Sequence, residues 1–311
     1  TTTVQLAEKT AKAVTGSVEE WTGFLQSAAR LYKYSYPEQL LIYAQRPDAT
    51  ACASYEIWNQ TMRRYVRRGA RGIALPDGAG AVRYVFDVAD TGTRKSSREV
   101  KTWALDENNR EAVAHALETQ YGSAAKLGIA GQLEEIAMQQ SMDYWQWHQD
   151  ELRGIVDGSF LEGYDELNLE IAFRNTAAAS VKYMLLSRCD LAREYQIEPE
   201  ELAGVLEWNT SAASGALGSA ISELSEGVLR QIERTIRQYE RSQNHDERTD
   251  VYEERRVLDS RSDSSRTADG AEQIRTDAGA VSEGASDDHL QQPAPERRFH
   301  PLCGAGRGMR P

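Results

Sequence analysis

Five arginines fall within nine residues in the first quarter of the chain. They are Arg63, Arg64, Arg67, Arg68 and Arg71, and no acidic residue lies among them. A guanidinium group binds phosphate through a planar fork of donors and also stacks on the flat face of a base. These residue types therefore predict a surface for a polynucleotide, although a solvated basic segment without a partner has the same composition.

The local sequence also predicts how these arginines are presented. Residues 65–67 alternate as in a short strand, Arg68 and Gly69 suit a tight turn, and residues 72–75 suit a return strand. We therefore predict a two-stranded ribbon that carries guanidinium groups. Tyr65 lies between the arginine pairs, and we include it among the expected contacts.

A group of tyrosines precedes the arginines. Tyr32, Tyr34 and Tyr36 alternate, which in an extended segment directs all three side chains to one side. Two interpretations stay open, because the three rings suit either a stacking platform for bases or a wall between two helices. We add four residues of this region to the expected DNA contacts: Lys33, Tyr34, Tyr36 and Arg46.

Motifs of common enzyme classes are missing from the sequence. It contains no HExxH, no phosphate-binding P-loop and no GxSxG elbow. His115 and His148 stand alone, so surface or partly packed positions suit them better than metal ligation. Cys52, Cys189 and Cys303 lie far apart, which argues against structural zinc and a disulfide framework and favours a reducing, cytoplasmic setting. We predict a non-enzymatic protein without a cofactor.

Charge is divided unevenly along the chain, whose net charge is −12. Residues 1–105 hold 15 Lys and Arg and 10 Asp and Glu, whereas the remaining 206 residues hold 21 and 38. The first part suits an anionic partner and the second repels one. No segment approaches the ~18 apolar residues of a membrane span, so no membrane partner is expected. The chain begins at Thr1 rather than Met, which suits a trimmed chain, a processed chain or a piece of a longer reading frame.

The pattern of apolar residues predicts an α+β fold class, with a small helix and β-ribbon domain, an α-helical region and a disordered tail. We predict a flexible lead over residues 1–16, an α+β domain over 17–106, an acidic helical domain over 108–243 and disorder over 245–311. The first domain should contain helices from Ser17 to about Tyr32, over Pro37–Gln45 and over 54–62, strands over 82–88 and 100–105, and a polar loop over 90–97. The helical domain should contain helices over 111–121, 130–156, 166–189, 199–208 and 213–243.

Several of these segments together resemble a known family. The similarity lies in Trp21, Phe24-Leu25, Tyr34-Ser35, 39–42, Ala49-Thr50, Trp58 and the run Val66-Arg67-Arg68-Gly69-Ala70-Arg71-Gly72-Ile73. This pattern, over about residues 17–105, resembles the N-terminal domain of ArdC-type antirestriction proteins. With SFLEGYDELN at 159–168 and LLSRCDL at 185–191, the chain looks like the front part of LtrC-like proteins of conjugative transposons.

The resemblance implies a single-stranded-DNA-binding module of a mobile element, with helicase or methyltransferase regions of a longer parent protein as further partners. The metalloprotease half of ArdC and all helicase and methylase motifs are missing, so no catalysis is transferred from the family. The alternative function is an acidic helical adaptor, or a DNA mimic that occupies a restriction enzyme or repressor through protein contacts. The five arginines over residues 63–71 favour the single-stranded-DNA-binding function.

Overall fold

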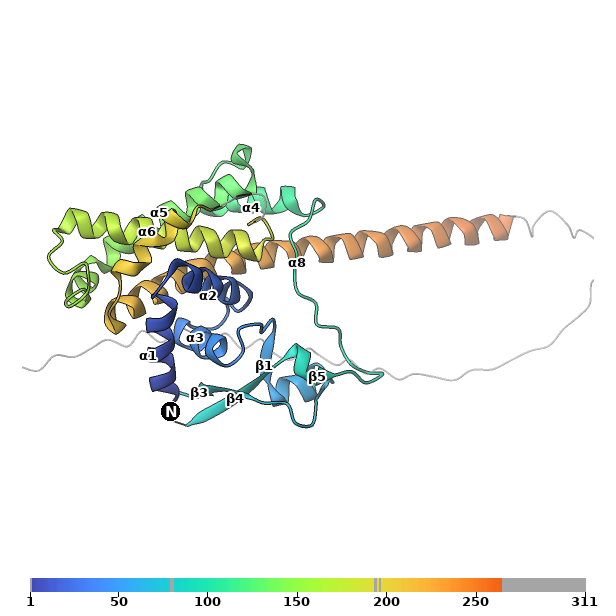
Figure 1. The fold of residues 1–311 in the computed structure, drawn as a ribbon. Helices are drawn as coiled ribbons and strands as arrows, with labels where there is room; N and C mark the ends of the chain where they lie inside the picture. Colours follow the sequence, from blue (N-terminus) through green and yellow to red (C-terminus); the bar gives the residue numbers. More distant parts are fainter. Residues whose placement is uncertain (1, 79–80, 193–194, 196, 265–311) are drawn as a thin grey trace, which may run out of the picture. The chain divides into compact units, whose positions relative to one another are not determined.

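The computed structural model describes most of the chain. The described residues are 2–78, 81–192, 195 and 197–264. The chain forms two compact units, Thr1–Glu253 and Glu254–Pro311. All the elements below belong to the first unit except the end of the last helix. The structure combines helices with small antiparallel sheets, which is compatible with the predicted α+β class (Figure 1).

Three helices open the chain: α1 (Thr3–Val14), α2 (Val18–Arg30) and α3 (Tyr36–Gln45). The Ser17 hydroxyl accepts a hydrogen bond from the Glu20 amide at 3.2 Å and so caps α2, as the sequence predicts. α3 begins with a proline in its first turn, also as predicted. The prediction of a flexible lead is wrong, because α1 packs against α3 and buries Ala11 and Val14.

Two small antiparallel sheets follow, and η1 (Ile57–Thr61) and η2 (Val88–Asp90) lie between their strands. The first sheet has the order β1-β4-β3, and the second pairs β2 with β5. The strands are β1 (Cys52–Ser54), β2 (Tyr65–Val66), β3 (Ile73–Pro76), β4 (Val82–Asp87) and β5 (Thr91–Gly92). One face of the larger sheet buries Ile73, Leu75 and Val85 against Leu41 and Ile42 of α3.

The rest of the first unit is helical. Its elements are α4 (Arg110–Tyr121), η3 (Ala125–Leu127), α5 (Gly128–Ile155), α6 (Glu166–Arg188), α7 (Pro199–Leu202), η4 (Ala203–Glu207) and α8 (Ser211–Ser264). They begin close to the predicted positions. α8 extends to Ser264, so the first part of the segment predicted as disordered is helical. The remainder of that segment, 265–311, lies outside the described residues.

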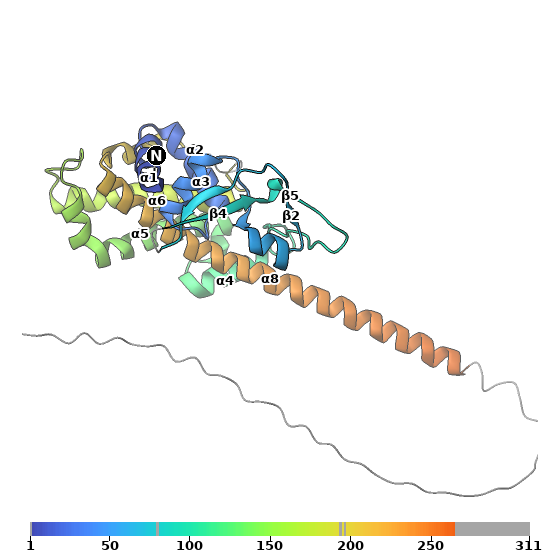
Figure 2. The ribbon, with the colours of Figure 1, turned by 90° about the horizontal axis from the view of Figure 1, so that it is seen from below.

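A shared core joins the two regions that the sequence divides near residue 107. α2 packs against α6, and the fully buried Trp21 donates from its indole nitrogen to the Ser180 hydroxyl at 3.0 Å. The Tyr32 hydroxyl donates to a Glu233 carboxylate oxygen on α8 at 2.6 Å. The helices α1–α3 therefore lie between the sheet and the long helices (Figures 1 and 2). The predicted boundary is absent, since both regions belong to one compact unit.

Residues 93–109, which we call the connector, lead from β5 to α4. The predicted strand over 100–105 is wrong, because the connector has no regular structure. Its Trp103 is buried, and the Arg188 guanidinium lies 3.4 Å from the centre of the indole ring. This contact ties the connector to the end of α6. Among the described residues, no helix is both long and apolar enough to cross a membrane.

Candidate nucleic-acid interface

We call residues 63–68 the arginine segment. It follows η1 and includes β2. Arg63 has a φ of 53°, a left-handed backbone conformation that residues other than glycine adopt only at an energetic cost. It reverses the chain so that the Arg64 amide donates to the Trp58 carbonyl at 2.8 Å. β2 then pairs with β5 and places Tyr65 opposite Gly92. The predicted ribbon is therefore wrong, because residues 73–76 pair with β4 in the other sheet.

The residues just before β2 also form hydrogen bonds with the start of the connector. The Ser97 hydroxyl donates to the Arg63 carbonyl at 2.7 Å, and the Arg98 amide donates to the Met62 carbonyl at 2.9 Å. These bonds hold a second group of cations beside the first. We call the combined set the basic surface, and it consists of Arg63, Arg64, Arg67, Arg68, Arg94, Lys95 and Arg98.

The charges of the basic surface are not neutralised within the part of the chain that the structure describes. None of its seven cations forms an ion pair with a described carboxylate. Arg64 donates to the Thr91 hydroxyl at 2.8 Å, and Arg67 donates to the Ala89 carbonyl at 3.2 Å. All seven residues except the half-buried Arg64 are exposed. Such a surface attracts a polyanion.

An accessible aromatic ring lies within the basic surface. Tyr65 is 40% exposed, and the Arg94 guanidinium lies 5.5 Å from the centre of its ring. The Tyr65 ring also packs on Gly92, where any β-carbon would overlap it. Glycine at this position therefore leaves room for the ring beside β5. A ring fixed in this way, with cations around it, suits the stacking of an unpaired base.

The remaining predicted contacts lie elsewhere. Lys33 pairs with Glu233 at 2.6 Å, and Tyr34 is half-buried with its hydroxyl donating to the Cys52 carbonyl at 2.8 Å. Arg46 forms an ion pair with Asp90. Exposed Arg71 helps to line an open depression beside Arg46, outside the basic surface.

For the tyrosines before α3, the structure supports the core alternative. Tyr36 is only 4% exposed, so its predicted role as a DNA contact is wrong, and Tyr32 is 3% exposed. The Tyr36 ring packs edge-on against Phe24 at 5.7 Å between ring centres. The three side chains do not line one side of an extended segment, because Tyr36 is already the first residue of α3. Only Tyr34 stays partly accessible.

A further aromatic surface was missed from the sequence. The face of the larger sheet opposite α3 carries Tyr84 and Phe86, and Tyr55 follows β1 nearby around a shallow groove. Tyr84 is 56% exposed and Tyr55 is 53% exposed. The period-two pattern of β4 already separates Tyr84 and Phe86 from the inward-facing Val85. That pattern was the available signal for a second aromatic platform.

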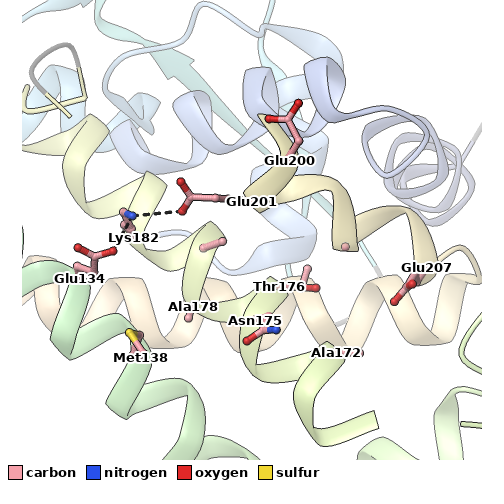
Figure 3. A pocket seen from close by; sticks show the side chains of 12 residues that line it. Glu134, Met138, Ala172, Asn175, Thr176, Ala178, Lys182, Glu200, Glu201 and Glu207 are labelled. Atoms are coloured by element: carbon pink, nitrogen blue, oxygen red, sulfur yellow. Dashed lines mark hydrogen bonds and ion pairs between the residues drawn. The ribbon is translucent and has the colours of Figure 1, made fainter. Parts of the chain in front are cut away.

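The helical region contains a groove of different character, with α6 as its floor (Figure 3). We call it the acid-lined groove, and its charged residues are Glu134, Lys182, Glu200, Glu201 and Glu207. Lys182 donates to Glu134 at 2.8 Å and to Glu201 at 3.2 Å. Burial opposes the charge on Lys182, but these bonds outweigh burial and raise the pKa of its amine. A lysine held protonated in this way is unsuited to act as a nucleophile.

The described cysteines are unsuited to nucleophilic chemistry. Burial raises the pKa of the Cys52 thiol to about 12, with the Asp87 charge acting in the same direction. Burial also raises the pKa of the Cys189 thiol to about 12. Both thiols are therefore protonated at neutral pH, whereas a nucleophilic or metal-binding cysteine is a thiolate. Within the described ranges, no three His, Cys, Asp or Glu side chains lie close enough to hold a metal ion.

Comparisons of the chain with protein-family models, curated proteins and solved structures returned no match. The likeness to ArdC-type domains therefore stays a prediction from the residues quoted above. The exposed features of this part of the molecule are the basic surface, which includes the Arg94–Tyr65 contact, and the aromatic side chains of Tyr84 on β4 and Tyr55 after β1.

Proposed function

We propose that this chain binds single-stranded DNA through the basic surface and takes part in DNA processing or antirestriction for a mobile element. The observation that carries the proposal is the meeting of two basic segments, 63–68 and 94–98, whose cations have no carboxylate partner among the described residues. The net charge of the protein is −12, but these cations create a local positive potential that attracts a polyanion.

The aromatic rings support a single strand over a duplex. Bases of a single strand are free to stack on Tyr65, and each base–aromatic contact contributes roughly 1–3 kcal/mol. In a duplex the faces of the bases are covered by their neighbours, so only phosphate contacts remain. We therefore expect a single strand to bind more tightly than a duplex of the same length.

The test is fluorescence anisotropy with a labelled thymine oligonucleotide and the variant Arg68→Glu/Lys95→Glu/Arg98→Glu. These side chains are exposed and make no described side-chain bond, so the fold should survive their replacement. We expect affinity to fall on the order of 100-fold at low salt, and the slope of log K against log salt to become less steep by about 2.

The matched control is Lys9→Glu/Lys12→Glu/Lys126→Glu, which changes the net charge equally at exposed positions on α1 and η3. It should bind nearly as well as the parent chain. If both variants lost the same amount of oligonucleotide affinity, the binding would depend on overall charge, and the basic surface would not be the site. Circular dichroism of both variants checks that the helices remain.

The acid-lined groove favours a second candidate function, that of an acidic adaptor or DNA mimic. Its four glutamates outnumber the single Lys182, which suits a basic protein segment. Direct binding of the full chain to a restriction enzyme or repressor without nucleic acid, lost on Glu200→Gln/Glu207→Gln, tests this function. The control Glu19→Gln/Glu111→Gln replaces two exposed glutamates elsewhere.

A further inference from the structure

A small pocket is lined by residues of the connector, the ends of α2 and α6, and the middle of α8. Its volume is about 220 Å³. Its five cationic lining residues come from four separate segments of the chain: Arg30 and Lys33, Lys101, Arg188, and Arg237. The pocket has one acidic lining residue, Glu233. The convergence of these side chains depends on the fold, because the four segments are far apart in the sequence.

Glu233 is already engaged by the pocket's own donors. It accepts hydrogen bonds from Tyr32 at 2.6 Å and from Arg237 at 3.2 Å, and it pairs with Lys33 at 2.6 Å. Burial opposes its charge, but these donors outweigh burial and lower the pKa of its carboxyl group. Glu233 therefore neutralises the charges of Lys33 and Arg237 in part, and the other cations of the pocket form no ion pair with a carboxylate in the part of the chain that the structure describes.

Arg188 is the most informative of those cations. It donates to the Trp103 carbonyl at 2.9 Å and stacks on the indole ring, but it forms no ion pair with any described carboxylate. It is half-buried, and burial lowers the pKa of its guanidinium although the Glu233 charge acts in the opposite direction. A desolvated guanidinium without an anion is a ready binding group for one.

The other unneutralised cations are Arg30 and Lys101. The Arg30 guanidinium is oriented by the carbonyls of Ala49 at 3.0 Å and Pro47 at 2.9 Å, which carry no full charge. Lys101 is exposed at the mouth of the pocket, where its own carbonyl accepts from Arg237 at 3.2 Å. Carbonyls that fix a guanidinium in place reduce the entropy lost when an anion binds.

We propose that this pocket binds a phosphate group of the monoester class, with Arg188 as its principal ligand and Arg30 and Lys101 as supporting cations. The volume is below the 300–1,000 Å³ of pockets that enclose a whole drug-sized ligand, so it suits the phosphate rather than an entire nucleotide. A doubly charged phosphate and a planar guanidinium fork match in charge and geometry. The site does not depend on the basic surface or on the proposed function.

The test is isothermal titration of the full chain with inorganic phosphate and with adenosine 5′-monophosphate. We expect saturable binding that Arg188→Gln weakens about 10- to 100-fold, the loss typical of a hydrogen bond to a charged group. The control is Arg174→Gln on the same helix, since Arg174 pairs with Glu170 at 2.8 Å and lies outside the pocket. Thermal melting checks that both variants fold.

Lys101→Gln provides a second variant that leaves the core untouched, because Lys101 is exposed on the connector. It should weaken phosphate binding by about threefold, as expected for one solvent-exposed charge contact. The Arg68→Glu/Lys95→Glu/Arg98→Glu variant should keep phosphate binding, which separates failure of this inference from failure of the proposed function. Absence of saturable binding at millimolar phosphate, or equal weakening by Arg174→Gln and Arg188→Gln, would overturn the assignment.

Two oligonucleotides identify the source of the phosphate. If a 5′-phosphorylated strand binds more tightly than its 5′-hydroxyl counterpart, and Arg188→Gln removes the difference, the pocket holds a strand terminus. If the two strands bind alike while adenosine 5′-monophosphate binds the pocket, the source is a free phosphate monoester. Both outcomes support the phosphate site.

Discussion

The basic surface and the acid-lined groove hold cationic side chains in opposite ways. In the groove, Lys182 lies between Glu134 and Glu201 and has its charge satisfied within the protein. On the basic surface, two segments meet with seven cations and no described ion pair. The first arrangement stabilises the packing of α5, α6 and α7, whereas the second leaves its positive charge available to a partner.

The difference teaches that the density of charge in a sequence does not identify a binding surface. The helical region is rich in charged residues of both signs, and many of its arginines pair within a helix, as Arg230 does with Glu226 at 2.6 Å. Arginines over 63–68 have no such neighbours within a turn, and the fold adds 94–98 rather than an acidic segment. The binding surface is therefore identified by the absence of carboxylate partners among the described residues, and less by the number of arginines.

The largest expected effect tests whether the two regions share one core. Trp21→Ala removes a fully buried ring that joins α2 to α6, and it should lower the free energy of unfolding by about 3–5 kcal/mol. Denaturant unfolding followed by circular dichroism and by tryptophan fluorescence should show one transition in both the parent and the variant. Two separated transitions in the parent chain would mean that the basic and acidic regions are independent domains.

The next effect sharpens the role of the basic surface. Tyr65→Ala should weaken binding of a single-stranded oligonucleotide by roughly 1–3 kcal/mol, because it removes the ring available for stacking. Tyr65→Phe keeps the ring and should restore most of the affinity in the same anisotropy assay. Tyr36→Phe is the matched control at a buried tyrosine and should not change the affinity. Equal affinity of Tyr65→Ala and the parent would leave phosphate contacts as the whole of the interaction.

The smallest effect concerns the groove. Lys182→Met should cost about 1 kcal/mol of stability at neutral pH, since the lysine is largely buried but both glutamates are substantially exposed. The folded state raises the pKa of Lys182 above its ordinary value of 10.5, so its contribution is complete below that pH. It is lost as the pH rises through the folded-state pKa.

The difference between the parent chain and Lys182→Met should therefore shrink in alkaline solution, as measured by urea unfolding over a pH series. The control Lys126→Met replaces an exposed lysine on η3 and should leave the free energy of unfolding at neutral pH close to that of the parent chain. Oligonucleotide binding should be unchanged in both variants. Weaker binding in Lys182→Met would assign the groove a part in the interface.

Local patterns in the sequence were sufficient for most of the helices. The cap at Ser17 and the proline at the start of α3 operate within one turn, so α2 and α3 could be placed without knowledge of the fold. The strand β4 was also predicted correctly from its β-branched and aromatic residues. These elements depend on neighbours that are close in the chain.

The partner of the arginine strand could not be found in this way. Residues 73–76 are nearer to β2 in sequence and have suitable strand propensity, yet β2 pairs with Thr91–Gly92. The choice depends on α3, which buries Ile73 and Leu75 and so draws that strand into the larger sheet. For the same reason, the contribution of Arg94 and Lys95 to the site was missed in a segment that reads as a polar loop.

The contact between Gly218 of α8 and the Tyr36 ring leaves no space for a β-carbon on α8. The N-terminal helices therefore complete their packing only against a segment that is synthesised almost two hundred residues later. During translation, aromatic side chains of α2 and α3 therefore remain partly exposed to solvent until the first turns of α8 leave the ribosome. We expect the nascent chain to depend on chaperones up to that point, and a product that stops at the end of the connector to aggregate.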